Sequence, residues 1–334
     1  MNYDFQLDYV SSELEKRKPK KVLLQFPEGL RVYSVPIVDE LKRRFPRIEF
    51  IVSAEPSWGA CDIAEDEAKL IGADLIVHFG HSPYTWYFPK IDTIFVRAES
   101  LLTISKDTIN ELINLLQKYD TKSVGLTATA QHYRNLLNLK GELEKAGYEV
   151  KLGEPSNRFM FPGQVLGCDY RAALSVSADV YVNISGGEFH TIGLGLAVQK
   201  PVIKVDPYTS KVEDYSEKVW KIIKIRYAKI YEALDSNVWA IIQGLKVGQN
   251  RPYYVDFLKK KLEEQGKKVY VFTNKVMTRD ALRNIDNGTI DVFVITSCPR
   301  IPTDDLYDYE KPVLTPGEAR MIINKKLEPY IFPW

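Results

Sequence analysis

Three cysteines, Cys61, Cys168 and Cys298, are the residues of this 334-residue chain whose type and spacing point most directly to chemistry. Each is more than a hundred residues from the next. An odd number of isolated thiols cannot form a closed set of disulfides, and no two have the close spacing of a structural zinc site. If the fold brings them together, three thiolates can hold a metal cluster with one coordination position open. The alternative is that each cysteine is a small apolar side chain of the core.

The surroundings of the cysteines favour a soft-metal centre. All three lie in short turn-like contexts, at residues 58–62, 166–169 and 296–300, and Pro299 follows Cys298 as in many ferredoxin-type sequences. Cysteinate suits iron–sulfur clusters, zinc and copper(I). A 4Fe–4S cluster held by three cysteines leaves one iron open to a substrate or cofactor. Zinc is the competing interpretation, with water or one histidine as fourth ligand; the histidines are His78, His81, His132 and His190.

Composition narrows the class of protein. The formal net charge is +1, from 45 basic and 44 acidic side chains, which gives no global electrostatic case for binding nucleic acid or an anionic membrane. Basic clusters at residues 16–21, 42–44 and 259–261 are expected to be solvated helix faces. No apolar run approaches the ~20 residues of a membrane helix, and the first residues do not resemble a signal peptide. A reducing, cytoplasmic location is therefore expected, which suits free thiolates.

Short β-branched runs that end in turn residues predict three sets of four strands. Amphipathic stretches between them, such as 107–119, 133–146, 191–198 and 253–265, predict helices. Continuous apolar strands that alternate with helices indicate parallel sheets covered on both faces. The predicted strands are 22–26, 50–54, 75–79, 93–96; 124–127, 149–152, 180–184, 202–205; and 238–243, 268–273, 292–296, 312–314.

The similar spacing within the three sets predicts an α/β fold of three similar domains, related by duplication, each a four-stranded parallel sheet flanked by helices. The expected domains are 1–103 with Cys61, 104–214 with Cys168, and 215–334 with Cys298. Ligands of open parallel sheets bind beyond the carboxyl ends of the strands, and each cysteine follows a predicted strand. We therefore expect one thiol from each domain to meet at a pseudo-threefold centre. A single eight-stranded barrel with additions is the alternative.

In its three cysteine contexts and in several further segments, the chain resembles a known family, the archaeal diphthamide-synthesis enzymes, or 2-(3-amino-3-carboxypropyl)histidine synthases. The likeness spans essentially the whole chain. Pro83 and Tyr84, which follow Ser82, depart from the family's pattern and leave the role of that loop open. The similarity rests on the three cysteine contexts and on Phe26-Pro27-Glu28-Gly29-Leu30, His78-Phe79-Gly80-His81-Ser82, Thr129-Ala130-Gln131-His132, Gly187-Glu188-Phe189-His190 and Lys204-Val205-Asp206-Pro207-Tyr208.

The resemblance implies a fold, cofactors and a reaction. It implies three similar domains with one cysteine each on a 4Fe–4S cluster, in a homodimer. The open iron would engage S-adenosylmethionine, and electron transfer to the sulfonium would break the bond between sulfur and the methionine γ-carbon. A 3-amino-3-carboxypropyl radical would then add to carbon 2 of a histidine imidazole in translation elongation factor 2. The tightly spaced cysteine triplet of most radical S-adenosylmethionine enzymes is absent from this sequence.

Five further residues are candidates for binding the cosubstrate. Backbone amides at Gly186 and Gly187 precede a predicted helix and suit a carboxylate, here that of the methionine moiety. His190 is a candidate hydrogen-bond donor, and Gln131 lies on the predicted ligand edge. Arg300, beside Cys298, can offer positive charge to a carboxylate or to the cluster. The plainer alternatives are a tight turn, a structural histidine and a surface ion pair.

Two other functions stay open from the sequence. A dehydratase similar to quinolinate synthase also arranges three domains around a three-cysteine cluster. A non-catalytic α/β protein that binds a small molecule would use the cysteines only as buried thiols.

Overall fold

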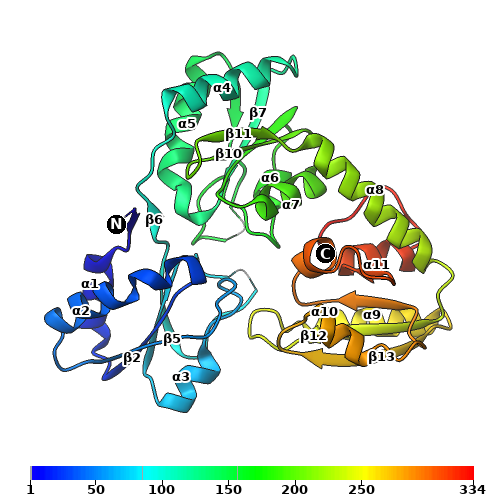
Figure 1. Cartoon of the computed structure of the whole chain (residues 1–334), viewed down its shortest axis with the longest axis horizontal. Helices are drawn as coiled ribbons and strands as arrows, with labels where there is room; N and C mark the ends of the chain where they lie inside the picture. Colours follow the sequence, from blue (N-terminus) through cyan, green and yellow to red (C-terminus); the bar gives the residue numbers. More distant parts are fainter. Residues whose placement is uncertain (1, 85, 156) are drawn as a thin grey trace.

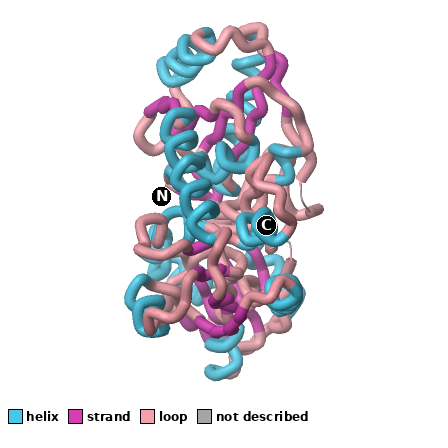
Figure 2. The backbone as a smooth tube through the Cα atoms, turned by 90° about the vertical axis from the view of Figure 1, so that its right-hand side faces the viewer, coloured by secondary structure: helices cyan, strands magenta, loops and turns pink. Residues whose placement is uncertain are grey.

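The computed structural model describes residues 2–84, 86–155 and 157–334. It is an α/β fold with three mainly parallel sheets, which lie at three corners of the molecule in Figure 1. The side view in Figure 2 shows helices and loops packed around the strands over the length of the molecule. Among the described residues, no helix is long and apolar enough to cross a membrane.

The first sheet has the order β3-β2-β4-β5, with all pairs parallel. Alternate residues of β2 enter two different cores, which explains why the strand is apolar throughout: Val22 and Leu24 pack under α1 and α2, whereas Leu23 packs on the opposite face with α3. The elements are β2 (Lys21–Gln25), β3 (Glu49–Val52), β4 (Leu75–Phe79), β5 (Asp92–Val96), α1 (Leu7–Arg17), α2 (Ser34–Arg44) and α3 (Glu65–Ile71), with a 3₁₀ helix at Glu28–Tyr33. A separate antiparallel pair joins β1 (Tyr3–Asp4) to β6 (Glu99–Ser100).

The second sheet has the order β11-β10-β9-β7-β8. Here the expectation of four parallel strands is wrong, because a fifth strand, β11, pairs antiparallel with β10 at the edge. This strand is only four residues long and mostly polar, so the pattern of apolar runs does not predict it. The elements are β7 (Ser123–Ala128), β8 (Glu149–Lys151), β9 (Val180–Ile184), β10 (Val202–Asp206), β11 (Lys211–Asp214), α4 (Lys106–Gln117), α5 (Tyr133–Lys145), α6 (Arg171–Leu174) and α7 (Glu188–Val198), with a 3₁₀ turn at Ala130–His132.

The third sheet has the order β13-β12-β14-β15 and is parallel. Taken along the chain, all three sheets therefore share the order second, first, third, fourth strand. The elements are β12 (Val238–Gly244), β13 (Lys268–Asn274), β14 (Val292–Ile295), β15 (Val313–Leu314), α8 (Ser216–Ala233), α9 (Pro252–Glu264), α10 (Arg279–Ile285) and α11 (Pro316–Ile323), with a π-helical turn at Ile301–Asp305.

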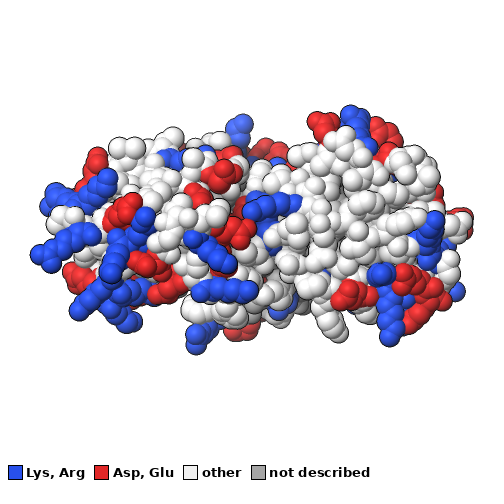
Figure 3. Space-filling model, turned by 90° about the horizontal axis from the view of Figure 1, so that it is seen from below, with Lys and Arg blue, Asp and Glu red and all other residues white. Residues whose placement is uncertain are grey.

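All twelve predicted strands are present, with bounds within two residues of those expected. The barrel alternative is wrong, since the strands form open sheets. The helix expected at 191–198 begins earlier, at Glu188, because Gly187 has an extended backbone and is the N-cap residue of the helix. The basic clusters form ion pairs with nearby acidic residues, as in Arg44 with Glu40 and Lys261 with Glu264. Figure 3 accordingly shows basic and acidic side chains intermingled on the face it presents.

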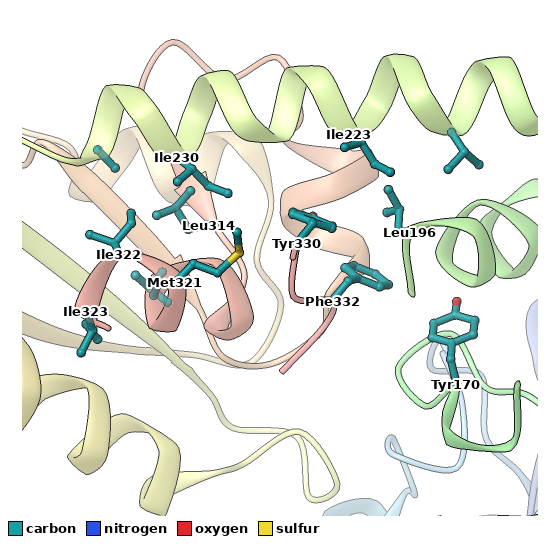
Figure 4. Packing of buried hydrophobic residues seen from close by; sticks show 14 of the residues in the cluster. Tyr170, Leu196, Ile223, Ile230, Leu314, Met321, Ile322, Ile323, Tyr330 and Phe332 are labelled. Atoms are coloured by element: carbon teal, nitrogen blue, oxygen red, sulfur yellow. The ribbon is translucent and has the colours of Figure 1, made fainter. Parts of the chain in front are cut away.

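The largest core joins the second and third sheets. Tyr170 and Leu196 of the second unit belong to one continuous apolar cluster with Leu314 and Met321 of the third. Figure 4 shows this cluster beneath the long helix α8, with the side chain of Ile223 directed into it. Burial of this shared surface holds the two units together, because separating them would expose large apolar side chains to water.

A buried ion pair anchors the same region. Arg226 of α8 donates to both carboxylate oxygens of Glu318, at 2.8 and 2.6 Å, and to the carbonyl oxygens of Pro302 and Val313. Glu318 also accepts a hydrogen bond from the Tyr330 hydroxyl at 2.7 Å and caps α11 with Thr315. Both charged side chains are at most 1% exposed, so every polar atom must find its partner inside the protein.

We predict that Arg226→Met lowers the free energy of unfolding by about 3–5 kcal/mol, because it leaves the Glu318 carboxylate buried without its counter-charge. Urea denaturation measures the loss. The matched control is Lys221→Met on the same helix, whose ion pair with Glu217 is exposed to solvent and whose removal should leave the midpoint nearly unchanged. Equal midpoints for the two variants would contradict the prediction.

Candidate metal centre

The shared strand order sets where ligands can bind. It places the first strand of each sheet (β2, β7, β12) beside the third (β4, β9, β14), and a crevice opens at the carboxyl ends of such neighbours. Most of the segments that the sequence singled out follow these strands. They lie at 26–30, 80–82, 129–132, 185–190 and 296–300. The segment 245–251, which the sequence did not single out, is the corresponding loop after β12 in the third unit.

Cys61 is held by the loop that follows β12. The amide of Gly248 donates to the Cys61 carbonyl at 2.9 Å, and the side-chain amide of Gln249 donates to the Cys61 sulfur at 3.5 Å. The approach is so close that a Cβ atom on Gly248 would lie 2.5 Å from the Cα atom of Cys61. Only glycine fits there, so the first and third units meet at this cysteine.

Cys168 and Cys298 are joined through Tyr84 and Arg251. The Tyr84 hydroxyl lies 3.4 Å from the Cys168 sulfur and accepts a hydrogen bond from Arg251 Nη2 at 2.6 Å. Arg251 Nη1 also donates to the carbonyl oxygens of Thr296 and Ser297, at 3.2 and 3.4 Å, directly before Cys298. A continuous series of contacts therefore connects the cysteine loops of the second and third units through a residue of the first.

The thiols influence one another electrostatically. Burial, and then the nearby Cys168 and Cys298, raise the pKa of Cys61 to about 12. The pKa of Cys298 is likewise raised to about 12, by burial and by Cys168, and burial raises the pKa of Cys168 against the opposing effect of Arg251. The three cysteines are partly buried, and their thiols thus share one region of limited access to solvent. Without added positive charge they are protonated at neutral pH.

The donor set fits a cluster of several metal atoms. Among the described residues, no three His, Cys, Asp or Glu side chains converge closely enough to hold a single metal ion. A cubane cluster places each ligand on a different iron, so its three thiolates need not converge on one point. The Gln249 amide and the Tyr84 hydroxyl supply hydrogen bonds to sulfur of the kind that surrounds such clusters.

Two of the histidines, His78 and His81, lie within hydrogen-bonding distance of each other. His78 lies between Gln25 and His81, with ring nitrogens 2.7 and 2.9 Å from their partner atoms. Burial lowers the pKa of His81 to about 4, with a further contribution from His190, and burial with Arg300 lowers the pKa of His190 to about 4. Both rings are neutral at pH 7, and His81, His190 and Arg300 lie near one another.

The other predicted residues occupy different positions in the same region. Gly186 and Gly187 are exposed at the start of α7, and a Cβ atom on Gly186 would meet the Tyr208 ring at 2.7 Å. Gln131 donates its side-chain amide to the carbonyl oxygen of Gly80, so it links the second unit to the first. Arg300 forms ion pairs with Asp304 at 3.0 Å and Asp305 at 3.4 Å, and its guanidinium lies 5.8 Å from the centre of the Phe189 ring.

Sequence reasoning missed four residues of the centre: Tyr84, Gln249, Arg251 and Trp334. The indole of Trp334 donates to the Cys168 carbonyl at 2.8 Å. The position of Gln249 and Arg251 after the first strand of the third set was an available signal. The contacts of Tyr84 and Trp334 depend on how the units meet, which no local pattern records.

Fold and site together define an α/β protein that brings three thiols, from loops far apart in sequence, to the meeting edges of parallel sheets. The family model described as "Putative diphthamide synthesis protein" matches residues 26–331, so the chain belongs to this family.

Named relatives and solved structures agree with this assignment. The chain is 33% identical to the 2-(3-amino-3-carboxypropyl)histidine synthase of Pyrococcus horikoshii, over 98% of this chain and 93% of the relative. It is 30% identical to subunit 1 of the synthase from Eremothecium gossypii, over 97% of this chain and 75% of that protein. The crystal structure of Dph2 from Pyrococcus horikoshii with a 4Fe–4S cluster superposes with a TM-score of 0.85, over 98% of this chain and 93% of that one.

We predict that Cys61 and Cys298 of the folded, metal-free protein titrate well above the usual range. Only the thiolate is alkylated, so the rate of their reaction with iodoacetamide should still rise about tenfold per pH unit between pH 8.5 and 10. In the urea-unfolded chain the rate should level off above pH ~8.5. Mass spectrometry follows each cysteine. The slope against pH is the readout, since restricted access lowers the rate without moving the pKa. A plateau below pH 9 in the folded protein would contradict the raised pKa values.

Proposed function

We propose that this protein transfers the 3-amino-3-carboxypropyl group of S-adenosylmethionine to carbon 2 of a histidine imidazole in translation elongation factor 2, the first step of diphthamide biosynthesis. The observation that carries the proposal is the whole-chain match to a synthase family, in a fold where the three cysteine loops meet. A dehydratase similar to quinolinate synthase and a non-catalytic binding protein account for the cysteines but not for this match.

In this proposal Cys61, Cys168 and Cys298 hold a 4Fe–4S cluster and are the residues through which catalysis runs. When bound, the cluster supplies one electron to the sulfonium of S-adenosylmethionine at its open iron, and the bond between sulfur and the methionine γ-carbon breaks. The low-potential chemistry this needs is favoured where water is kept away, and the raised pKa values of Cys61 and Cys298 come first from that poor solvation. The products are methylthioadenosine and an aminocarboxypropyl radical, which would add to carbon 2 of the acceptor imidazole; loss of the carbon-2 proton and return of one electron to the oxidised cluster would then complete the substitution.

We assign the amino-acid part of S-adenosylmethionine to the edge beside Cys298. Gly186 and Gly187 offer backbone amides at the start of the eleven-residue helix α7, where a carboxylate is favoured. Arg300 supplies the positive charge, since a pKa of about 4 keeps His190 neutral and limits it to hydrogen bonding. Gln131 completes the set from the second unit and fixes this edge against Gly80.

The proposal extends to architecture and partners. We assign the domains as 1–103, 104–214 and 215–334, related by duplication about a pseudo-threefold centre; the common strand order of the three sheets supports this. The shared core of the second and third units makes their boundary a tightly packed one. We further propose a cytoplasmic homodimer whose protein substrate is elongation factor 2, with no direct role for nucleic acid or membrane.

We predict that Cys61→Ala, Cys168→Ala and Cys298→Ala each abolish the formation of methylthioadenosine from S-adenosylmethionine in anaerobic, dithionite-reduced protein, because each removes one cluster ligand. Liquid chromatography measures the product, and circular dichroism checks the fold. The matched control is Arg283→Met, which replaces a half-exposed side chain paired with Glu310 at 3.1 Å and should retain activity.

Retained turnover in all three cysteine variants would contradict the proposal. Tight binding of dihydroxyacetone phosphate in place of S-adenosylmethionine would favour the dehydratase instead. Colourless, iron-free protein after anaerobic reconstitution would favour the binding protein.

A further inference from the structure

Arg251, in the third unit, is linked through the Tyr84 hydroxyl of the first unit to the Cys168 sulfur of the second. It directly precedes α9 in the third unit, and its guanidinium fork divides between the Cys298 loop and Tyr84 of the first unit. Nη1 reaches the Thr296 and Ser297 carbonyls before Cys298, whereas Nη2 reaches the Tyr84 hydroxyl, which touches the Cys168 sulfur. A planar fork with fixed N–H directions can hold these partners at once, which a lysine ammonium on a flexible stem cannot do as well.

Aromatic rings fix the guanidinium from the side. Its central carbon lies 3.6 Å from the centre of the Trp334 ring and 4.9 Å from that of Trp86. The two indoles pack edge to face at 5.9 Å, and Trp334 is itself tied to the Cys168 carbonyl at 2.8 Å. The contacts with these two rings therefore hold the cation in one position.

The partners of Arg251 leave its charge uncompensated. The ion pairs among the described residues include neighbouring cations, such as Arg171 with Asp169 and Lys246 with Asp62, but none involves Arg251. Carbonyl oxygens and a phenol accept its hydrogen bonds, and an indole ring lies against it, but none of these groups neutralises the charge. A cation that is half-buried among such groups is costly unless an anion approaches it. Thiolates on a cluster would be that anion.

We propose that Arg251 is a positioning residue of the cluster site: its fork holds the Cys168 and Cys298 loops in register, and its fixed charge stabilises the reduced cluster. This inference rests on the proposed function. A positive charge beside the cluster favours the state with one more electron, so Arg251 raises the reduction potential. The two parts of the role separate by substitution, since lysine keeps the charge and loses the fork, whereas methionine loses both.

The test compares wild-type protein with Arg251→Met, Arg251→Lys and the exposed control Arg283→Met, all reconstituted anaerobically with iron and sulfide. A redox titration followed by electron paramagnetic resonance gives the potential, and the rate of iron loss to a chelator gives retention. For Arg251→Met we expect the ratio of reduced to oxidised cluster, at a fixed applied potential, to fall about tenfold, which for one electron is ~59 mV. Iron loss should be about tenfold faster.

Arg251→Lys should lose iron faster than the wild type but keep a potential close to it, and Arg283→Met should match the wild type in both. If Arg251→Met takes up no iron at all, Arg251→Lys decides, because the proposal requires it to load iron with the wild-type potential. An Arg251→Met protein with unchanged potential and unchanged iron loss overturns this inference alone. Wild-type protein that binds no iron overturns the proposed function along with it.

Discussion

Three thiols that approach one another in a poorly solvated junction cannot all ionise unless positive charge joins them. This constraint governs the centre of the molecule. Burial and mutual proximity raise the pKa values of Cys61 and Cys298 to about 12, and Arg251 acts against the rise at both Cys168 and Cys298. In the proposed site the three soft ligands are protonated before metal binding, and a positively charged metal centre would release their protons when it binds.

The fold meets this constraint by facing the edges of three sheets of the same strand order. The cysteines do not occupy equivalent places in them: Cys61 and Cys168 follow the second strand of their sheets, whereas Cys298 follows the third. Their meeting thus depends on how the sheets are set against one another. Two features fix this arrangement. Gly248 has no side chain and so lets the Cys61 backbone approach, and the core beneath α8 holds the second and third units together. The geometry of the three cysteines therefore depends on the residues that pack the units against one another.

The strands were predictable because parallel sheets covered on both faces need uninterrupted apolar runs, as in Leu75–Phe79 and Val180–Ile184, whose bounds agree with the prediction. The strands that were missed, β1, β6 and β11, are short or polar; β1 and β6 pair only with each other, and β11 pairs at the edge of its sheet. For the proposed centre, the cysteines could be singled out from the sequence because their chemistry is carried by the residue type. Tyr84 and Trp334 were not, because an aromatic side chain gains its role only from partners in another unit.

Mössbauer spectroscopy of protein reconstituted with ⁵⁷Fe tests the central claim most directly, because it resolves the iron sites of a cluster from one another. Three thiolates on a 4Fe–4S cluster leave one iron without a protein ligand. We predict that S-adenosylmethionine changes the signal of that one iron among four and leaves the other three nearly unaltered. Identical spectra with and without S-adenosylmethionine, or a signal from isolated ferric or ferrous ions, would contradict the account.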